Sequence, residues 1–206
     1  MVDAVIFDLD GVIREWNNHL AFDAESAAGI EPGTLLALAF SPDLGPAAVT
    51  GNLTWERWMD EVSARYVALH GADGHAIVAA WSADYGTLVP EMVLLLAEVR
   101  ASVPVAILSN GTTRLESELD HHGLTPLVDH VCNTARIGAA KPDAAAYRHA
   151  LEVLGVTADR AAFIDDLAIN VEAATALGLA AHRHEHHRST RTFLAGLGIV
   201  GHPNPL

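Results

Sequence analysis

Short runs of apolar residues recur along the chain, and polar residues close each run. The first run, Ala-Val-Ile-Phe at positions 4–7, contains no polar residue, which is typical of a strand buried on both faces of a parallel sheet. Residues 103–108 and 161–164 repeat this pattern, and residues 127–132 and 179–181 show it more weakly. The pattern predicts a buried parallel sheet.

Segments with the period of a helix lie between these runs. Apolar residues at i, i+3, i+4 and i+7 follow Pro90, namely Met92, Leu95, Leu96 and Val99. Residues 142–155 and 170–178 are predicted as two further helices, each bounded by a glycine. Because strands and helices alternate, the chain is expected to form an α/β fold with a doubly wound, Rossmann-like parallel sheet.

Residues 16–90 interrupt that alternation. Thr54 is a suitable N-cap for a helix with an apolar stripe, and residues 35–40 also have a helical pattern. The stripe consists of Trp55, Trp58, Met59, Val62, Tyr66 and Leu69. We therefore predict an α-helical cap at residues 16–90, inserted into a catalytic core of residues 1–15 and 91–206, where it would act as a lid.

Composition restricts the classes of partner. The chain has 12 Lys and Arg against 26 Asp and Glu, a net charge of −14 that disfavours nucleic acid and anionic membranes. It has no apolar run of about 18 residues and no N-terminal targeting segment, so we expect a cytoplasmic protein without a membrane span. The single cysteine, Cys132, excludes an intrachain disulfide, fits a reducing compartment and is expected to serve packing. The sequence does not distinguish a monomer from a homodimer.

Four polar segments lie where predicted strands end or predicted helices begin. They are Asp8-Leu9-Asp10-Gly11, Ser109-Asn110-Gly111, Lys141-Pro142 and Asp165-Asp166. Ligands of open α/β sheets bind at the carboxyl ends of the strands, so we expect these segments to form one site. Two like charges 4 Å apart repel by about 4 kcal/mol at an effective dielectric constant of about 20, so the carboxylates need a counter-ion. Oxygen ligands without sulfur favour Mg2+, and a lysine with free amides suits a phosphate, so the site is suited to phosphoryl transfer.

These four segments, in this order, resemble the signature motifs of the haloacid dehalogenase-like hydrolase superfamily. The matching residues are Phe7-Asp8-Leu9-Asp10-Gly11-Val12, Leu108-Ser109-Asn110-Gly111, Lys141-Pro142 and Phe163-Ile164-Asp165-Asp166. The resemblance covers essentially the whole chain, since the inserted helices match the helical cap of the family. Residues 165–174 are similar to the branch that contains small bacterial sugar-phosphate phosphatases and the phosphatase domain of soluble epoxide hydrolases.

The resemblance implies roles for the acidic residues. Asp8 would be the nucleophile that carries the phosphoryl group. Asp10 would protonate the departing alcohol and then deprotonate the water that clears the intermediate. Mg2+ would be bound by the Asp8 carboxylate, the Asp10 main-chain carbonyl and Asp166.

The resemblance also implies how the phosphate is bound. Ser109 and Asn110 would bind the transferring phosphoryl group and Lys141 would stabilise its charge. Gly111 supports the site, and Asp165 would act through a water or through Lys141. The predicted function is a Mg2+-dependent phosphomonoesterase that hydrolyses a small phosphorylated metabolite. The helical lid is the ground for a small substrate, since it would exclude large ones, and a sugar phosphate is one candidate.

Three other functions are weighed. A phosphosugar mutase shares the Asp-x-Asp-Gly-Val start and uses a cap histidine, but the residues around His19 match poorly. A non-catalytic metabolite-binding protein would have lost at least one of the carboxylates or the lysine, all of which are present. The dehalogenases of the superfamily lack a carboxylate at the position of Asp10, because displacement of a halide needs no proton. The presence of Asp10 therefore favours phosphate esters.

Several other residues have structural interpretations. The spacing of Trp55 and Trp58 favours packing inside the cap over lining a substrate pocket. The histidine-rich stretch at residues 182–188 is interpreted as a solvated loop and not as a set of metal ligands. Arg14 and Trp16 follow the catalytic loop closely enough to contact substrate, and neither is assigned a role.

Overall fold

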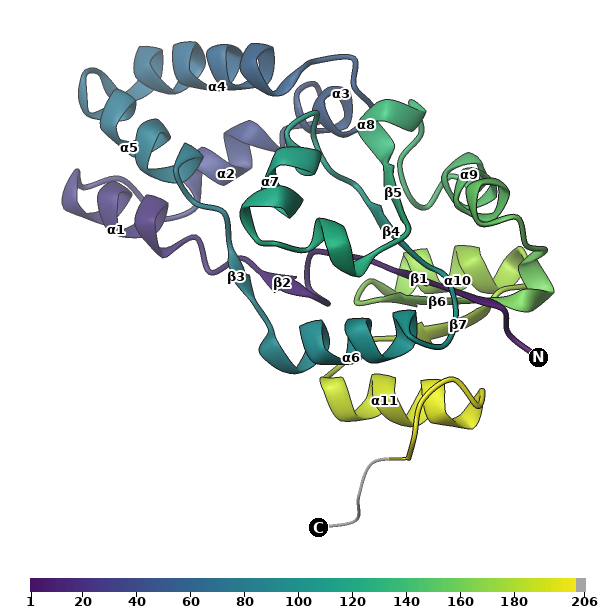
Figure 1. Ribbon diagram of the computed structural model, residues 1–206. Helices are drawn as coiled ribbons and strands as arrows, with labels where there is room; N and C mark the ends of the chain where they lie inside the picture. The colour runs from purple at the N-terminus through teal and green to yellow at the C-terminus, as the bar shows by residue number, and fades with distance from the viewer. Residues whose placement is uncertain (203–206) are drawn as a thin grey trace.

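The computed structural model describes residues 1–202 and contains a five-stranded sheet in the order β5-β4-β1-β6-β7 (Figure 1). Its strands are β1 (Ala4–Phe7), β4 (Val105–Ser109), β5 (His130–Asn133), β6 (Ala161–Asp165) and β7 (Ala180–Arg183). Every neighbouring pair is parallel. The chain runs outward from the central β1 to β4 and β5, and then returns to β6 on the other side. The predicted doubly wound sheet is confirmed.

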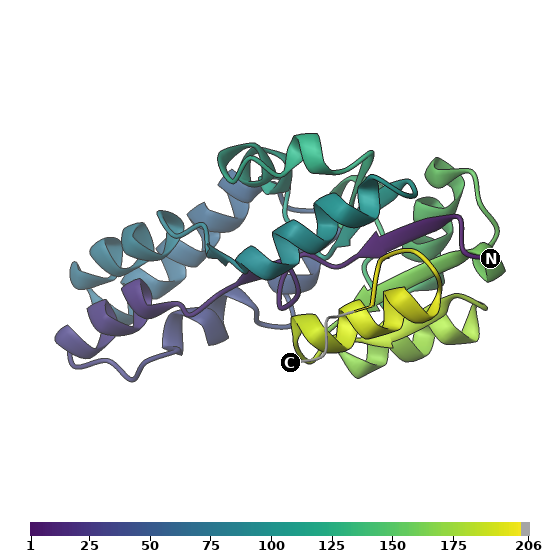
Figure 2. The same ribbon diagram turned by 60° about the horizontal axis from the view of Figure 1, so that its bottom comes forward.

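Helices cover both faces of this sheet (Figures 1 and 2). On the face to which Val5 and Phe7 point, the sheet packs against α6 (Pro90–Arg100), α7 (Leu115–His121) and α11 (His187–Gly196). On the face of Ile6 and Phe163 it packs against α8 (Thr134–Ile137), α9 (Ala144–Leu154) and α10 (Ala168–Ala176). Short 3-10 helices lie at Thr125–Leu127 and Ala158–Arg160. Since both faces are covered, β1 is fully buried, as its apolar sequence predicts.

The ends of the core helices follow from local chemistry. Pro90 begins α6, where its missing N–H is not needed. Asp143 precedes α9 and its carboxylate accepts a hydrogen bond from the Ala145 N–H at 2.8 Å. Gly155 follows the last residue of α9 with a φ of +68°, a conformation that favours glycine. Helix α10 begins at Ala168, earlier than the predicted start near Asn170.

The predicted cap segment, residues 16–90, contains five helices, which lie at one end of the molecule in Figure 2. They are α1 (His19–Ala27), α2 (Thr34–Ala39), α3 (Gly45–Val49), α4 (Trp55–His70) and α5 (Asp73–Ser82). Thr54 caps α4 as predicted, and Trp58 is 1% exposed at the centre of a separate apolar cluster. The prediction for Leu69 is wrong, because the last turn of α4 leaves that side chain 69% exposed.

A buried carboxylate joins three of the helices in this segment, α1, α2 and α4. Glu25 of α1 is inaccessible to solvent and accepts hydrogen bonds from the Gly33 and Leu35 N–H groups, each at 2.6 Å. The Tyr66 hydroxyl donates a third at 2.8 Å. These bonds satisfy the carboxylate that the cap buries, and they fix the turn before α2 against α4.

The cap is joined to the core at a small antiparallel ribbon and touches the core directly. The ribbon pairs β2 (Arg14–Glu15) with β3 (Thr87–Leu88), one on each side of the cap in the sequence. The Thr134 hydroxyl donates to the Val49 carbonyl at 2.7 Å, and the Trp55 N–H donates to the Thr113 hydroxyl at 2.8 Å. We propose on this basis that the cap and the core are two domains with the cap seated on the core.

Two further sequence interpretations have clear outcomes. The stretch 182–188 is not simply a loop: β7 extends through Arg183 because it pairs with Asp165, and α11 begins at His187. Within residues 1–202, none of its histidines belongs to a group of three side chains placed to hold a metal ion. No helix in that range is long and apolar enough to cross a membrane.

We predict that Cys132 reacts with a thiol reagent only after unfolding. The side chain is 1% exposed in β5, and burial raises the pKa of its thiol to about 12. Thiol titration at mildly alkaline pH should therefore detect the group in denaturant and not in the native protein. Rapid reaction of the native protein would contradict the packing of β5 against α9.

We predict that Gly51→Ala disrupts the contact between the cap and the core. Gly51 has a φ of +73°, and a β-carbon there would lie 2.0 Å from the Ala135 carbonyl oxygen. The left-handed conformation alone costs a non-glycine residue about 1–2 kcal/mol, so the free energy of unfolding should fall by more than this. Gly29→Ala is the matched control, since Gly29 has a φ of +71° and no described atom within 4 Å of the added carbon. Equal losses in urea unfolding would contradict the contact.

Candidate active site

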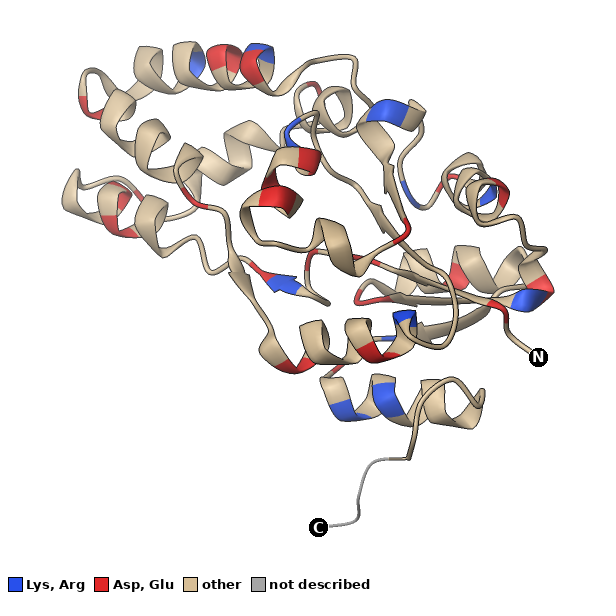
Figure 3. Cartoon of the chain, viewed as in Figure 1, with Lys and Arg blue, Asp and Glu red and all other residues tan. Residues whose placement is uncertain are grey.

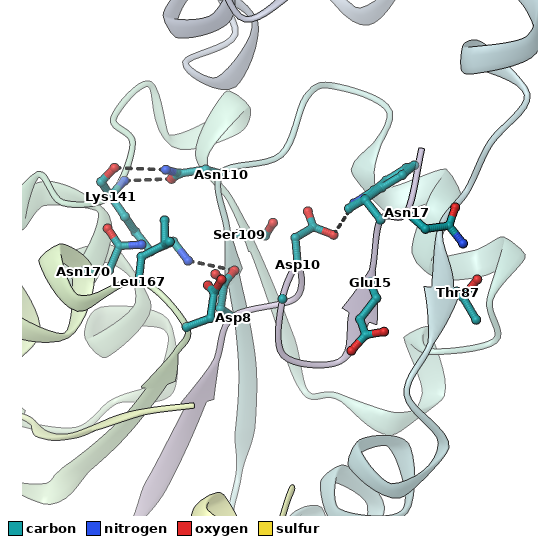
Figure 4. A pocket seen from close by; sticks show the side chains of 13 residues that line it. Asp8, Asp10, Glu15, Asn17, Thr87, Ser109, Asn110, Lys141, Leu167 and Asn170 are labelled. Carbon is teal, nitrogen blue, oxygen red and sulfur yellow. Dashed lines mark hydrogen bonds and ion pairs between the residues drawn. The ribbon is translucent and has the colours of Figure 1, made fainter. Parts of the chain in front are cut away.

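A cavity of about 640 Å³ opens at the carboxyl ends of β1, β4 and β6 (Figure 4). It is lined by six of the residues predicted for the site: Asp8, Asp10, Ser109, Asn110, Lys141 and Asp166. Asp165 lies directly behind them as the last residue of β6 and is inaccessible to solvent. Gly111 lies at the edge of a neighbouring cavity. The four sequence segments are therefore brought together at one place.

Lys141 is buried between two carboxylates. Its Nζ lies 2.8 Å from Asp8 Oδ1 and 2.7 Å from Asp165 Oδ2. Burial alone would lower the pKa of Lys141, but the charges of Asp8 and Asp165 outweigh burial and raise it. The lysine is therefore a fixed positive charge beside Asp8, whose Oδ1 also accepts a hydrogen bond from the Leu9 N–H at 2.7 Å.

Asp165 supports this lysine, and both of its carboxylate oxygens already accept hydrogen bonds. Its Oδ1 accepts hydrogen bonds from the Leu167 N–H at 2.9 Å and from Asn170 Nδ2 at 3.0 Å. Asn170 is buried on α10, and the Tyr147 hydroxyl donates to its carbonyl at 3.0 Å. The sequence reasoning missed Asn170. Its position on the inward face of the helix that follows Asp165-Asp166 is the feature that could have identified it.

Asn110 holds the main chain of Lys141. Its Nδ2 donates to the Lys141 carbonyl at 3.0 Å, and its Oδ1 accepts from the Lys141 N–H at 2.8 Å. The side-chain amide of Asn110 is thus engaged on the lysine loop, as the paired dashed lines of Figure 4 show. Ser109 ends β4 and faces the cavity while nearly buried. This places a hydroxyl and the main-chain amides that follow it at the turn after β4.

The acidic residues of the site outnumber its cation. Asp8, Asp165 and Asp166 each offer a carboxylate oxygen within 4.8 Å of the others. Burial raises the pKa of Asp8 well above its ordinary value; Lys141 opposes this, and Asp165 adds to it. Burial and Asp165 also raise the pKa of Asp166. An all-oxygen site with excess negative charge fits a hard divalent cation such as Mg2+.

Gly11 lets the catalytic loop pass close to Asp166. Its φ is +81°, and a β-carbon there would lie 2.4 Å from Asp166 Oδ2. Both the backbone conformation and the lack of space require glycine. The Asp-x-Asp-Gly sequence therefore brings the loop after β1 against the loop after β6.

Asp10 has partners that the sequence did not reveal. Its carboxylate points away from Asp8 in Figure 4, and its Oδ1 accepts from Arg14 Nε at 2.7 Å and from Trp16 Nε1 at 2.8 Å. Arg14 is itself buried and donates to Glu118 at 2.9 Å. Burial would lower the pKa of Arg14, but Asp10 and Glu118 outweigh it and raise the pKa, so Arg14 stays charged. Arg14 and Trp16 thus hold the Asp10 side chain.

Acidic residues exceed basic ones over the chain as a whole, 26 against 12 (Figure 3). The overall field therefore repels an anionic substrate. An anionic ligand could bind in the cavity only through local positive charge, which Lys141 supplies and which a metal ion beside Asp8 and Asp166 would increase.

Two curated relatives are phosphatases by name. Phosphatase MT3486 of Mycobacterium tuberculosis is 36% identical over 94 residues, which are 45% of this chain and 43% of that protein. The sesquiterpene phosphatase astK of Aspergillus oryzae is 28% identical over 186 residues, which are 85% of this chain and 86% of that protein. The chain thus spans less than half of the first relative and most of the second.

Solved structures share the fold. A HAD family enzyme of Bacteroides thetaiotaomicron, in complex with magnesium and inorganic phosphate, matches with a TM-score of 0.71 at 19% identity over 90% of this chain and 95% of its own. An L-2-haloacid dehalogenase of Xanthobacter autotrophicus matches with a TM-score of 0.68 at 24% identity over 100% and 85%. A family model described as haloacid dehalogenase-like hydrolase covers residues 2–178. The chain belongs to the haloacid dehalogenase-like hydrolase family.

Proposed function

We propose that the protein is a Mg2+-dependent phosphomonoesterase that hydrolyses a small phosphorylated metabolite through an aspartyl phosphate on Asp8. The observation that carries this proposal is the placement of Asp8 between the Lys141 ammonium at 2.8 Å and the carboxylate of Asp166. The two phosphatase relatives, and a structural neighbour that holds magnesium and phosphate, support the same class of reaction.

The first chemical step is a transfer to Asp8. Lys141 and the Leu9 N–H hold Oδ1 of Asp8, and we assign the other oxygen, Oδ2, to attack on phosphorus. As the new oxygen–phosphorus bond forms, the bond to the alcohol oxygen breaks, and Asp10 gives that oxygen a proton. Lys141, the Ser109 hydroxyl and the main-chain amides after it stabilise the transferring oxygens.

The second step returns Asp8 to its free form. Asp10, now ionised, takes a proton from a water as the water oxygen attacks phosphorus. The bond between phosphorus and Asp8 breaks, and inorganic phosphate leaves. Asp165 takes no direct part, because its oxygens hold Lys141 and Asn170.

The metal ion would be held by the Asp8 carboxylate, the Asp10 main-chain carbonyl and the Asp166 carboxylate. The fit rests on the oxygen donors of the site and on their uncompensated charge. When bound, Mg2+ would neutralise negative charge on the phosphoryl oxygens. Gly11, which has no β-carbon, leaves room for the Asp166 carboxylate beside the loop after β1.

No observation favours the other enzyme functions over this one. His19, the residue considered for a mutase, is exposed at the start of α1 and contacts Asn17. The match to a dehalogenase structure concerns the fold, and the carboxylate of Asp10 has no task in the displacement of a halide. A phosphomonoesterase mechanism therefore gives a role to more of the residues in the cavity than the mutase or dehalogenase mechanism does.

We predict that Asp8→Asn abolishes hydrolysis of p-nitrophenyl phosphate, because the amide is not a nucleophile. Removal of divalent metal from the wild type with EDTA should have the same effect, and added Mg2+ should restore the rate of the wild type alone. Asp73→Asn, at the start of a cap helix, is the matched control and should keep full activity. Metal-dependent turnover by Asp8→Asn would contradict the assignment of the nucleophile.

We predict that Asp10→Asn separates the two steps. p-Nitrophenolate leaves without a proton, so phosphorylation of Asp8 should proceed, while hydrolysis of the intermediate should slow by about 10²–10⁴-fold. Stopped-flow absorbance should show a burst of about one product per enzyme, followed by slow turnover. An alkyl phosphate, whose leaving group needs the proton, should give no burst of released alcohol in acid-quenched samples. Turnover of both esters by Asp10→Asn at the wild-type rate would contradict the acid–base assignment.

A further inference from the structure

A second cavity of about 240 Å³ adjoins the catalytic one and has an aromatic wall. All four tryptophans of the chain line it, together with Phe40: Trp16, Trp55, Trp58 and Trp81. We propose that this aromatic cavity receives the leaving group, and that the substrate is a phosphate monoester of a predominantly apolar alcohol. The proposal rests on the proposed phosphatase function and names its substrate class.

The position of the aromatic cavity matches the path of the leaving group. Both cavities are lined by Asp10, Trp16 and Asn110, so they meet at Asp10. In an in-line displacement the alcohol departs on the side of phosphorus opposite the attacking Asp8. Asp10 must reach that alcohol oxygen to protonate it. An ester whose phosphate lies beside Asp8 and Lys141 would therefore extend past Asp10 into the aromatic cavity.

The rings of the aromatic wall pack against one another, and Phe40 is the most exposed of them. Trp58 packs against Trp55 and Trp81 with ring centroids 5.5 and 5.4 Å apart. Phe40 meets Trp58 edge to face at 5.4 Å and is 55% exposed. An apolar ligand would cover the exposed part of Phe40 and gain contact with rings that need no rearrangement.

The polar residues of the aromatic cavity are mostly engaged with each other. Arg14 is paired with Asp10 and Glu118, and the Asn110 amide is bonded to the Lys141 main chain. Among the described residues, Asp84 keeps a buried oxygen, Oδ2, without a partner, and Asn18 and Thr112 add polar side chains to a lining whose accessible surface is mostly apolar. A sugar would place most of its hydroxyl groups against this apolar surface, which disfavours its binding. The cavity chemistry therefore departs from the sugar phosphate considered from the sequence.

The test compares kcat/KM for two pairs of esters with Mg2+. We expect 1-naphthyl phosphate and geranyl phosphate to be hydrolysed at least about tenfold more efficiently than glucose 6-phosphate and glycerol 2-phosphate. Phe40→Ala should lower kcat/KM for the apolar esters about tenfold and for the polar ones by a clearly smaller factor. Leu69→Ala removes another exposed apolar side chain of the cap, outside the cavity, and should affect neither class.

Tryptophan fluorescence gives a readout that does not depend on catalysis. Since every tryptophan lines the cavity, geraniol should change the emission of the wild type and of Asp8→Asn, and glucose should not. Equal or better hydrolysis of the polar esters, with no response to geraniol, would overturn the proposed substrate class and leave the phosphatase function intact. A response to geraniol without hydrolysis of any ester would support the aromatic cavity and overturn the phosphatase function.

Discussion

The buried ammonium of Lys141 is the interaction on which the rest of the site depends. It contacts Asp8 of the β1 loop at 2.8 Å and Asp165 of β6 at 2.7 Å, and all three side chains are nearly inaccessible. Removal of one partner from a buried charge pair typically destabilises a protein by about 3–5 kcal/mol. The main chain at Lys141 must therefore be held in place. Asn110 holds it by forming hydrogen bonds with both the N–H and the carbonyl of Lys141.

The contacts of Lys141 with Asp8 and Asp165 also determine which carboxylates can face the cavity. The carboxylate oxygens of Asp165 accept hydrogen bonds from Lys141 and from the start of α10, whereas Asp8 and Asp166 face the cavity. Asp10 is held apart from them by Arg14 and Trp16, at the boundary with the aromatic cavity. In the proposed mechanism, the site thus separates the nucleophile, which needs neighbouring positive charge, from the acid, which must reach the leaving group.

The core fold and the main site residues were predictable because their causes are local. Strands such as Ala4–Phe7 are apolar on both faces, and a parallel sheet necessarily brings the residues after such strands to one edge. The partners of Asp10 were not predictable, because Glu118 is 104 residues from Arg14 and only the packing of α7 brings them together. Likewise, helical spacing correctly predicted that Trp58 packs inside the cap. It did not predict that the tryptophans of α4 and α5 would also line a cavity together with Trp16.

The central claim is that Asp8 carries the phosphoryl group during turnover. The most direct measurement is peptide mass mapping of the Asp10→Asn variant, quenched in acid during reaction with an aryl phosphate and Mg2+. We expect one added phosphoryl group on the peptide that contains Asp8, and its loss when Asp8 is also changed to Asn. A phosphoryl group found on Ser109, or none on any peptide while phosphate is released, would contradict the account.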